Sequence, residues 1–287
     1  MGTSQSSKGP GAGVPMVPPW VPEAGGGDMP AAGEGAPDAG ADPASPPDTP
    51  AQPPGPPPPV PVAPAARFRG ARRSLGEFAR TGDSRDLRRG LGHYVRSGYG
   101  GSPTATRRFG GTAATAGSLY GALSGAAAGE PRESGSPLDP VLLAGRSVDE
   151  VMDAVVEAVR PIDGTQDTEA ARAAIREALT ELLTRYPDAD LLSLDPDQRS
   201  FVIERYSAID VFRRFDLDLG QTIRDKAPSA TTGLSRLKQV RDYVREAVAA
   251  SFRKLRDAGH AVTAGRVSQV VRDALRDTFE VFEGYAE

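Results

Sequence analysis

TTGLSRLKQVRDYVREAVAASFRKLRD, residues 231–257, repeats apolar side chains three and four positions apart along its whole length. This spacing places them on one face of an α-helix, the longest that the sequence predicts. Gly259 follows the stretch and predicts the end of the helix. The predicted inward face comprises Leu234, Leu237, Val240, Tyr243, Val244, Val248, Phe252 and Leu255.

Helical periodicity also dominates the remainder of the chain after residue 66, with almost no alternating pattern of the β type. Ser147 and Glu150 form a capping-box pattern at the start of one helix. Thr168 is expected to cap the next helix, and Asp195 with Pro196 to open a third. We therefore predict an all-α protein, a helical bundle in which residues 138–287 form a C-terminal helical domain.

The last two helix boundaries within this domain are predicted from single residues. A break is expected near Gly220, and Thr263 is expected to cap the final helix. The inward residues of that helix are expected to be Val267, Val270, Val271, Leu275, Phe279 and Phe282. A domain of about 150 residues can bury close to 70% of the surface of its unfolded chain, so no further staple is required.

Residues 67–137 form a basic, glycine-rich helical region. Short helices are predicted over residues 69–81 and 84–96, with Ser84 as the cap of the second. From residue 102 to about 128 small residues dominate, and a helix of that composition needs close packing against a partner. Whether this region and residues 138–287 form one domain is left open by the sequence.

Positive charge is concentrated between residues 67 and 110, a range that contains eleven arginines and three acidic residues. Such a cluster is typical of a surface that contacts phosphates or an acidic partner protein. Because the whole chain has a net charge of −4, the acidic partner is the favoured interpretation. The candidate anion or nucleic-acid contacts are Arg67, Arg69, Arg72, Arg73, Arg88, Arg89, Arg107 and Arg108.

The N-terminal segment has a different composition, because residues 1–66 hold 19 of the 27 prolines. Proline and glycine oppose regular structure, so we expect a long disordered Pro/Gly-rich tail. Residues 23–66 form its linker, in which PPGPPPPVPVAP (residues 53–64) favours an extended polyproline II spacer over a proline-motif ligand. Residues 1–22 carry the only tryptophan, Trp20, and we interpret them as a recognition peptide.

Several classes of function lack support in the sequence. There is no cysteine, which removes disulfides and thiolate chemistry and favours the cytoplasm. His93 and His260 are the only histidines and accompany no catalytic motif, so we expect a protein that is not an enzyme and has no cofactor of its own. No apolar run has the length of a signal peptide or a membrane span, so contact with a membrane is not expected.

The start of the chain allows two chemical interpretations. Met1, Gly2 and Ser6 fit the short N-myristoylation pattern, a modification of eukaryotic proteins, whereas the composition is typical of a GC-rich bacterium. Removal of Met1 would instead leave a free glycine amine. With an ordinary pKa of about 7.7–8.0, part of that amine is neutral and nucleophilic at pH 7, and no side chain obstructs it.

Three segments carry a resemblance to a known family. They are MGTSQSSKGPGAGVPMVPPWV (residues 1–21), RGARRSLGEFARTGD (residues 69–83) and LGHYVRSGYGGSPTATRRFGGT (residues 91–112). Together they resemble the B component of the Qat bacterial antiphage defence system, clearly in the tail and basic region and only generically in the C-terminal helices.

The resemblance implies a non-enzymatic defence protein that acts beside a QueC-like 7-deazaguanine enzyme. The system's ATPase and TatD-like nuclease are implied as further partners. By the same resemblance, Gly2 would accept an activated 7-deazaguanine derivative as a covalent adduct. Residues that would bind the partner enzyme are Thr3, Ser4, Val14, Met16, Val17 and Trp20.

A second hypothesis remains beside this one. In it the chain is a nucleic-acid-binding adaptor of a defence complex, and the arginine-rich region 67–110 contacts DNA or RNA. An autonomous enzyme has the least support, because no nucleophile, base and stabilising group can be assembled from the sequence.

Overall fold

The computed structural model describes residues 66–124 and 137–286, and every regular element within these ranges is helical. The predicted all-α class is therefore confirmed. The predicted recognition peptide and nearly all of the predicted linker lie outside the described residues. The α-helices are α1 (Arg69–Thr81), α2 (Ser84–His93), α3 (Ser102–Arg108), α4 (Gly110–Leu123), α5 (Pro140–Leu143), α6 (Val148–Val159), α7 (Gln166–Arg185), α8 (Pro196–Phe215), α9 (Gln221–Lys226), α10 (Ala230–Asp257) and α11 (Val267–Glu283).

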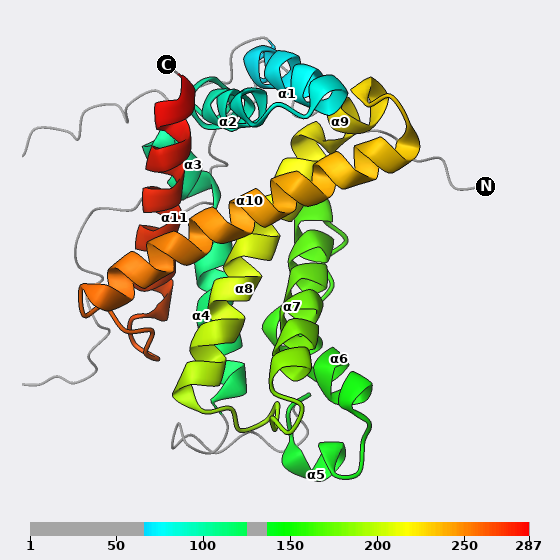
Figure 1. The fold of residues 1–287 in the computed structure, drawn as a ribbon. Coiled ribbons are helices and arrows are strands. Elements are labelled where there is room, and N and C mark those ends of the chain that lie inside the picture. The colour runs from blue at the N-terminus through cyan, green and yellow to red at the C-terminus, as the bar shows by residue number, and fades with distance from the viewer. Residues whose placement is uncertain (1–65, 125–136, 287) are drawn as a thin grey trace, which may run out of the picture.

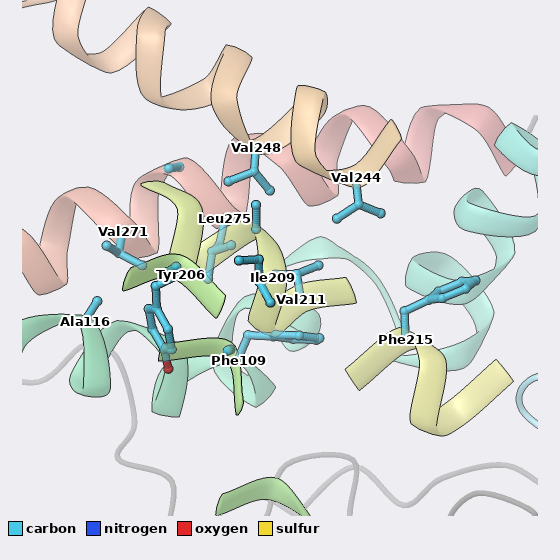
Figure 2. Packing of buried hydrophobic residues seen from close by; sticks show 14 of the residues in the cluster. Phe109, Ala116, Tyr206, Ile209, Val211, Phe215, Val244, Val248, Val271 and Leu275 are labelled. Carbon is cyan, nitrogen blue, oxygen red and sulfur yellow. The ribbon is translucent and has the colours of Figure 1, made fainter. Parts of the chain in front are cut away.

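Helix α8 is the centre of the bundle, since it packs against α4, α7 and α10. Figure 1 shows the long α10 crossing α8 and continuing to α11. Buried side chains from α4, α8, α10 and α11 meet in the core, as Figure 2 shows for Ala116, Ile209, Val248 and Leu275. Residues from both 67–137 and 138–287 belong to this one hydrophobic cluster.

The helix starts follow local capping chemistry. Ser147 and Glu150 form the expected capping box of α6, and Asp195 forms one with Gln198 at the start of α8. Helix α7 differs from its prediction because Thr165 is the cap.

In α7, the side chain of Thr165 accepts a hydrogen bond from the backbone N–H of Thr168 at 3.1 Å. Similarly, Asp83 and not Ser84 caps α2, because a carboxylate one residue earlier accepts from Arg85 N at 2.8 Å. The predicted cap of α11 was also wrong. The carbonyl of Thr263 instead accepts bonds from Arg266 and Val267 in a turn before the helix.

Two further boundaries differ from the sequence prediction. The small-residue helix expected from residue 102 is divided at Phe109, whose fully buried ring packs 5.0 Å from that of Phe279. The break expected near Gly220 is absent. There the backbone continues through a π-helical turn, η3 (Asp216–Gly220), directly into α9.

The long helix α10 was predicted almost to the residue, and Gly259 follows it with φ of +82°. Its inward face begins later than expected, because Leu234 is 65% exposed and Leu237 is the first buried leucine. Helix α11 is followed at its C-terminal end by a short 3-10 turn, η4 (Gly284–Ala286), that packs on α2.

One ion pair lies inside this core. Asp210 on α8 is fully buried, accepts a hydrogen bond from Thr112 Oγ1 at 2.5 Å and pairs with Arg214 Nε at 3.1 Å. Arg214 also reaches Asp167 Oδ2 on α7 at 3.0 Å. Burying a charge is costly unless it is paired and hydrogen-bonded, so these contacts fix α8 against α4 and α7.

Replacement of Asp210 should therefore be strongly destabilising. Asp210→Ala leaves the Thr112 hydroxyl without its acceptor and removes one of the two carboxylates that neutralise Arg214. We expect the free energy of unfolding, measured by urea denaturation, to fall by about 3–5 kcal/mol. Asp188→Ala, at an exposed position, is the control and should change it by less than about 0.5 kcal/mol. Equal effects of the two substitutions would contradict the proposed role of the buried pair.

Candidate functional site

Helices α1 and α2 form an antiparallel hairpin beside α9 and the start of α10 (Figure 1). Gly82 makes the turn between them with φ of +78°, a conformation that glycine adopts without steric cost. Gly92 allows a close approach to the C-terminal turn, because a Cβ atom there would lie 2.5 Å from the backbone nitrogen of Ala286. The hairpin is thus fixed to the body at both helices.

The outer surface of this hairpin carries most of its arginines. Four of the eight predicted anion contacts are exposed here. These four are Arg69, Arg73, Arg88 and Arg89. Arg80, Arg85 and Arg96 are exposed as well. We call these seven residues the arginine face.

Acidic neighbours neutralise this face only in part. Arg85 and Arg89 each lie 3.7 Å from a carboxylate oxygen of a nearby aspartate, and Arg80 pairs with Glu77. Such exposed pairs contribute little energy and can be exchanged for another anion. Within the described ranges, Arg69, Arg73 and Arg96 have no carboxylate within ion-pair distance.

The pKa of His93, at the end of α2, is affected by the positive charge of the arginine face. Its ring packs against Gly70 of α1, where an added Cβ would lie 3.0 Å from the ring. Partial burial lowers the pKa of His93, and repulsion by Arg89 and Arg96 lowers it further. The lowered pKa favours the neutral form of the imidazole.

The other four predicted contacts are less exposed. Arg67 is only 7% exposed, and its guanidinium carbon stacks 4.6 Å from the centre of the Phe68 ring. Arg108 is half-buried and pairs with Asp167 at 3.4 Å. Arg72 and Arg107 are also half-buried. The structure therefore does not bring all eight arginines together on one surface.

A buried polar cluster that the sequence did not indicate lies beneath the hairpin. Tyr99 and Tyr94 donate hydrogen bonds to Asp218 Oδ2 at 2.7 and 3.0 Å. Burial raises the pKa of Asp218, although both tyrosines and the nearby Arg67 oppose that change. Burial also raises the pKa of Tyr99 well above its ordinary value.

This cluster joins two π-helical turns. Tyr94 begins η1 (Tyr94–Gly98), Tyr99 directly follows it, and Asp218 is the central residue of η3. Single π turns are rare and occur frequently at functional sites. Here they attach the hairpin to the end of α8. Gly220, predicted as a break, is the last residue of η3.

The residues predicted for modification and partner binding belong to the N-terminal segment. Gly2, Thr3, Ser4, Val14, Met16, Val17 and Trp20 all lie outside the described residues. His93 and His260 lie on separate elements, at the end of α2 and after α10. A search of the described residues found no group of three or more potential metal ligands. Nor did it find a helix with the length and apolarity needed to span a membrane.

Fold and surface together define an all-helical protein that presents a basic hairpin on a compact body. The sequence matches the family described as Qat anti-phage system associated protein QatB over residues 100–282, more than half of the chain. The chain therefore belongs to the QatB family and to a Qat anti-phage system, which implies other Qat components. Neither the curated proteins nor the solved structures that were compared gave a significant match.

The matched residues run from the end of the η1 turn through α11. They include the central α8 and its partners, whereas the arginine face lies before them. The resemblance noted in the sequence rested chiefly on residues 1–112, so the two overlap only over residues 100–112. Family membership is thus shown by the helical body, and the tail and the hairpin lie before the matched residues.

Titration of His93 tests the effect of the neighbouring arginines on its pKa. Arg89→Ala removes one repelling charge and should raise the pKa of His93, which burial still holds below the ordinary value of about 6.5. Histidine proton resonances followed by NMR against pH measure this change. Arg85→Ala on the same helix is the matched control and should leave the pKa unchanged, because Arg85 is not among the charges that lower it. Equal shifts in the two variants would refute a local field at His93.

Proposed function

We propose that this chain is a non-enzymatic component of its Qat system and presents Gly2 as the acceptor for conjugation by a QueC-like enzyme. The membership of the helical body in the QatB family carries this proposal, because it associates the chain with other Qat components. In the proposal the body binds the partner enzyme, and the N-terminal residues reach its active site.

The chemistry fits an α-amine acceptor. The neutral amine of Gly2 attacks the carbonyl carbon of a 7-deazaguanine carboxylate that has been activated as an acyl-adenylate. A C–N amide bond forms, the C–O bond to AMP breaks, and the amine loses one proton to the solvent. Hydrogen is the smallest possible side group, so Gly2 allows the closest approach of the amine to an enclosed carbonyl.

The remaining residues of the N-terminal peptide are proposed to bind the enzyme. Trp20 and the apolar residues Val14, Met16 and Val17 supply contact area, and Thr3 and Ser4 supply hydrogen bonds beside the acceptor. The proline-rich segment 53–64 favours an extended chain of about 3.1 Å per residue and would separate this peptide from the body.

Intact-mass spectrometry after co-expression with the QueC-like enzyme of the same system tests the acceptor. We expect loss of Met1 and an added mass equal to that of the acyl group, located on Gly2 by fragmentation. Gly2→Ala keeps a small second residue and a free amine, and should be modified more slowly. Gly2→Leu should retain Met1 and carry no adduct. An unmodified Gly2 amine in the co-expressed wild-type protein would refute the acceptor role.

The arginine face favours a second contact, with an anionic surface. Arg69, Arg73 and Arg96 are exposed and lack a carboxylate partner within the described part of the chain. Guanidinium groups bind carboxylates and phosphates in similar geometry, so an acidic partner protein and a nucleic acid are both candidates. The acidic protein partner remains the favoured candidate because the chain as a whole is acidic.

Charge neutralisation on this face distinguishes the two candidates. A triple variant, Arg69→Gln, Arg73→Gln and Arg89→Gln, should weaken binding to the QueC-like enzyme in a salt-dependent manner, as measured by calorimetry. If the partner is instead a nucleic acid, gel shifts should lose about 0.9 from the log–log salt slope for each phosphate contact removed.

A matched control removes the same charge elsewhere. The substitutions Lys238→Gln, Arg253→Gln and Arg276→Gln lie at exposed positions of α10 and α11 and should leave both assays unchanged. An equal loss in both triple variants would assign the effect to net charge and would exclude the arginine face as the docking surface.

A further inference from the structure

A hollow of about 670 Å³ opens where α8 begins and α10 ends. Figure 1 shows these two helix ends on the same side of the molecule. The end of α7, the loop after α10, Val270 on α11 and Tyr120 on α4 also line it. This volume is typical of a pocket that encloses a small organic molecule. We call it the Phe201 pocket.

One wall of the Phe201 pocket alternates arginine and aromatic groups. The guanidinium carbon of Arg205 lies 4.9 Å from the centre of the Phe201 ring, and that of Arg185 lies 5.5 Å from it. Arg185 also lies 5.5 Å from the centre of the Tyr186 ring, which meets Phe201 edge to face at 6.0 Å. Flat guanidinium and ring surfaces of this kind stack against planar heterocycles.

The positive charges of the pocket exceed its negative charges. Arg185, Arg205 and Arg256 line it, and His260 adds a further nitrogen donor. Within the described chain Arg185 and Arg256 have no carboxylate within ion-pair distance, so both can bind another anion. Arg205 differs from these two, because it pairs with Glu181 at 3.5 Å and with Glu204 at 3.9 Å.

Two carboxylates give the same pocket acceptors for N–H groups. Asp197 and Glu204 line it, and Glu204 has a side chain only 15% exposed. Burial raises the pKa of Glu204, with the nearby Arg205 and Arg256 opposing that change. These groups together are complementary to a ligand that combines a flat ring, N–H donors and an anionic group.

We propose that the Phe201 pocket binds a purine mononucleotide, with the base against the arginine–aromatic wall and the phosphate held by Arg256 and His260. The exocyclic amino group or ring N–H of the base would donate to Glu204 or Asp197. Each part of this ligand class finds a complementary group in the lining, whereas inorganic phosphate would leave the stacking surfaces and both carboxylates unused. No lining residue of this pocket belongs to the arginine face.

Isothermal titration calorimetry of the full chain with AMP and GMP tests the proposal. Adenosine, guanosine and inorganic phosphate serve as partial ligands. We expect at least one nucleotide to bind, and its nucleoside and phosphate alone to bind at least tenfold more weakly. Arg256→Ala should weaken nucleotide binding about tenfold without lowering the melting temperature, because Arg256 is exposed. Arg253→Ala, also exposed on α10 and outside the pocket, is the matched control.

A second variant separates stacking from charge. Phe201→Leu should weaken binding of the nucleotide and its nucleoside and leave the weak binding of phosphate unchanged. The proposal is overturned if neither nucleotide binds at millimolar concentration. It also fails if phosphate binds as tightly as the nucleotide, or if Arg256→Ala and Arg253→Ala have equal effects.

Discussion

The charge buried in α8 fixes the helices at the centre of the bundle against one another. Asp210 has no exposed surface, and its carboxylate is stabilised by Thr112 on α4 and by Arg214 on its own helix. Arg214 extends this network to Asp167 on α7, and Arg108 on α3 contacts the same carboxylate. Apolar packing tolerates small shifts of one helix along another, but a buried hydrogen-bonded ion pair does not. The small side chains of α4 supply the close contact that brings Thr112 within reach of Asp210.

Sequence periodicity predicted the fold class and the extent of α1 and α10, because burial of an apolar face determines where a helix lies. The capping box predicted the start of α6. Periodicity failed where a tertiary contact competes with local preference. Phe109 ends α3 because its ring is required in the core, and Gly220 continues a helix because the π turn there is held by Asp218. For the candidate sites, composition identified the basic hairpin but could not separate exposed Arg69 from buried Arg67. Their difference in exposure arises from the packing of Phe68 and Tyr99, which one-dimensional spacing does not encode.

The buried tyrosine–aspartate cluster fixes the hairpin to the helical body. The hairpin itself precedes the residues that match the family. Tyr94 stacks on Phe68 and meets Phe215 edge to face, so aromatic contacts surround the hydrogen bonds to Asp218. Arg236 at the start of α10 adds a contact to Phe78 on α1. A basic helix pair without these contacts would expose its apolar face, since the two helices alone are too short for independent stability. The arginine face is therefore presented by a rigid support.

The two proposed binding surfaces of the body lie at opposite ends of one continuous helical segment. From Pro196 to Lys226 the backbone stays helical through α8, η3 and α9, a length on the order of 45 Å at 1.5 Å per residue. The Phe201 pocket is at its beginning, and α1 packs on α9 at its end. A macromolecule on the arginine face and a nucleotide in the pocket would thus not compete for space. Coupling between the two surfaces would require a movement of α8 or α10. The buried Asp210 network holds α8 to its neighbours midway between the surfaces, so it resists a movement of that helix.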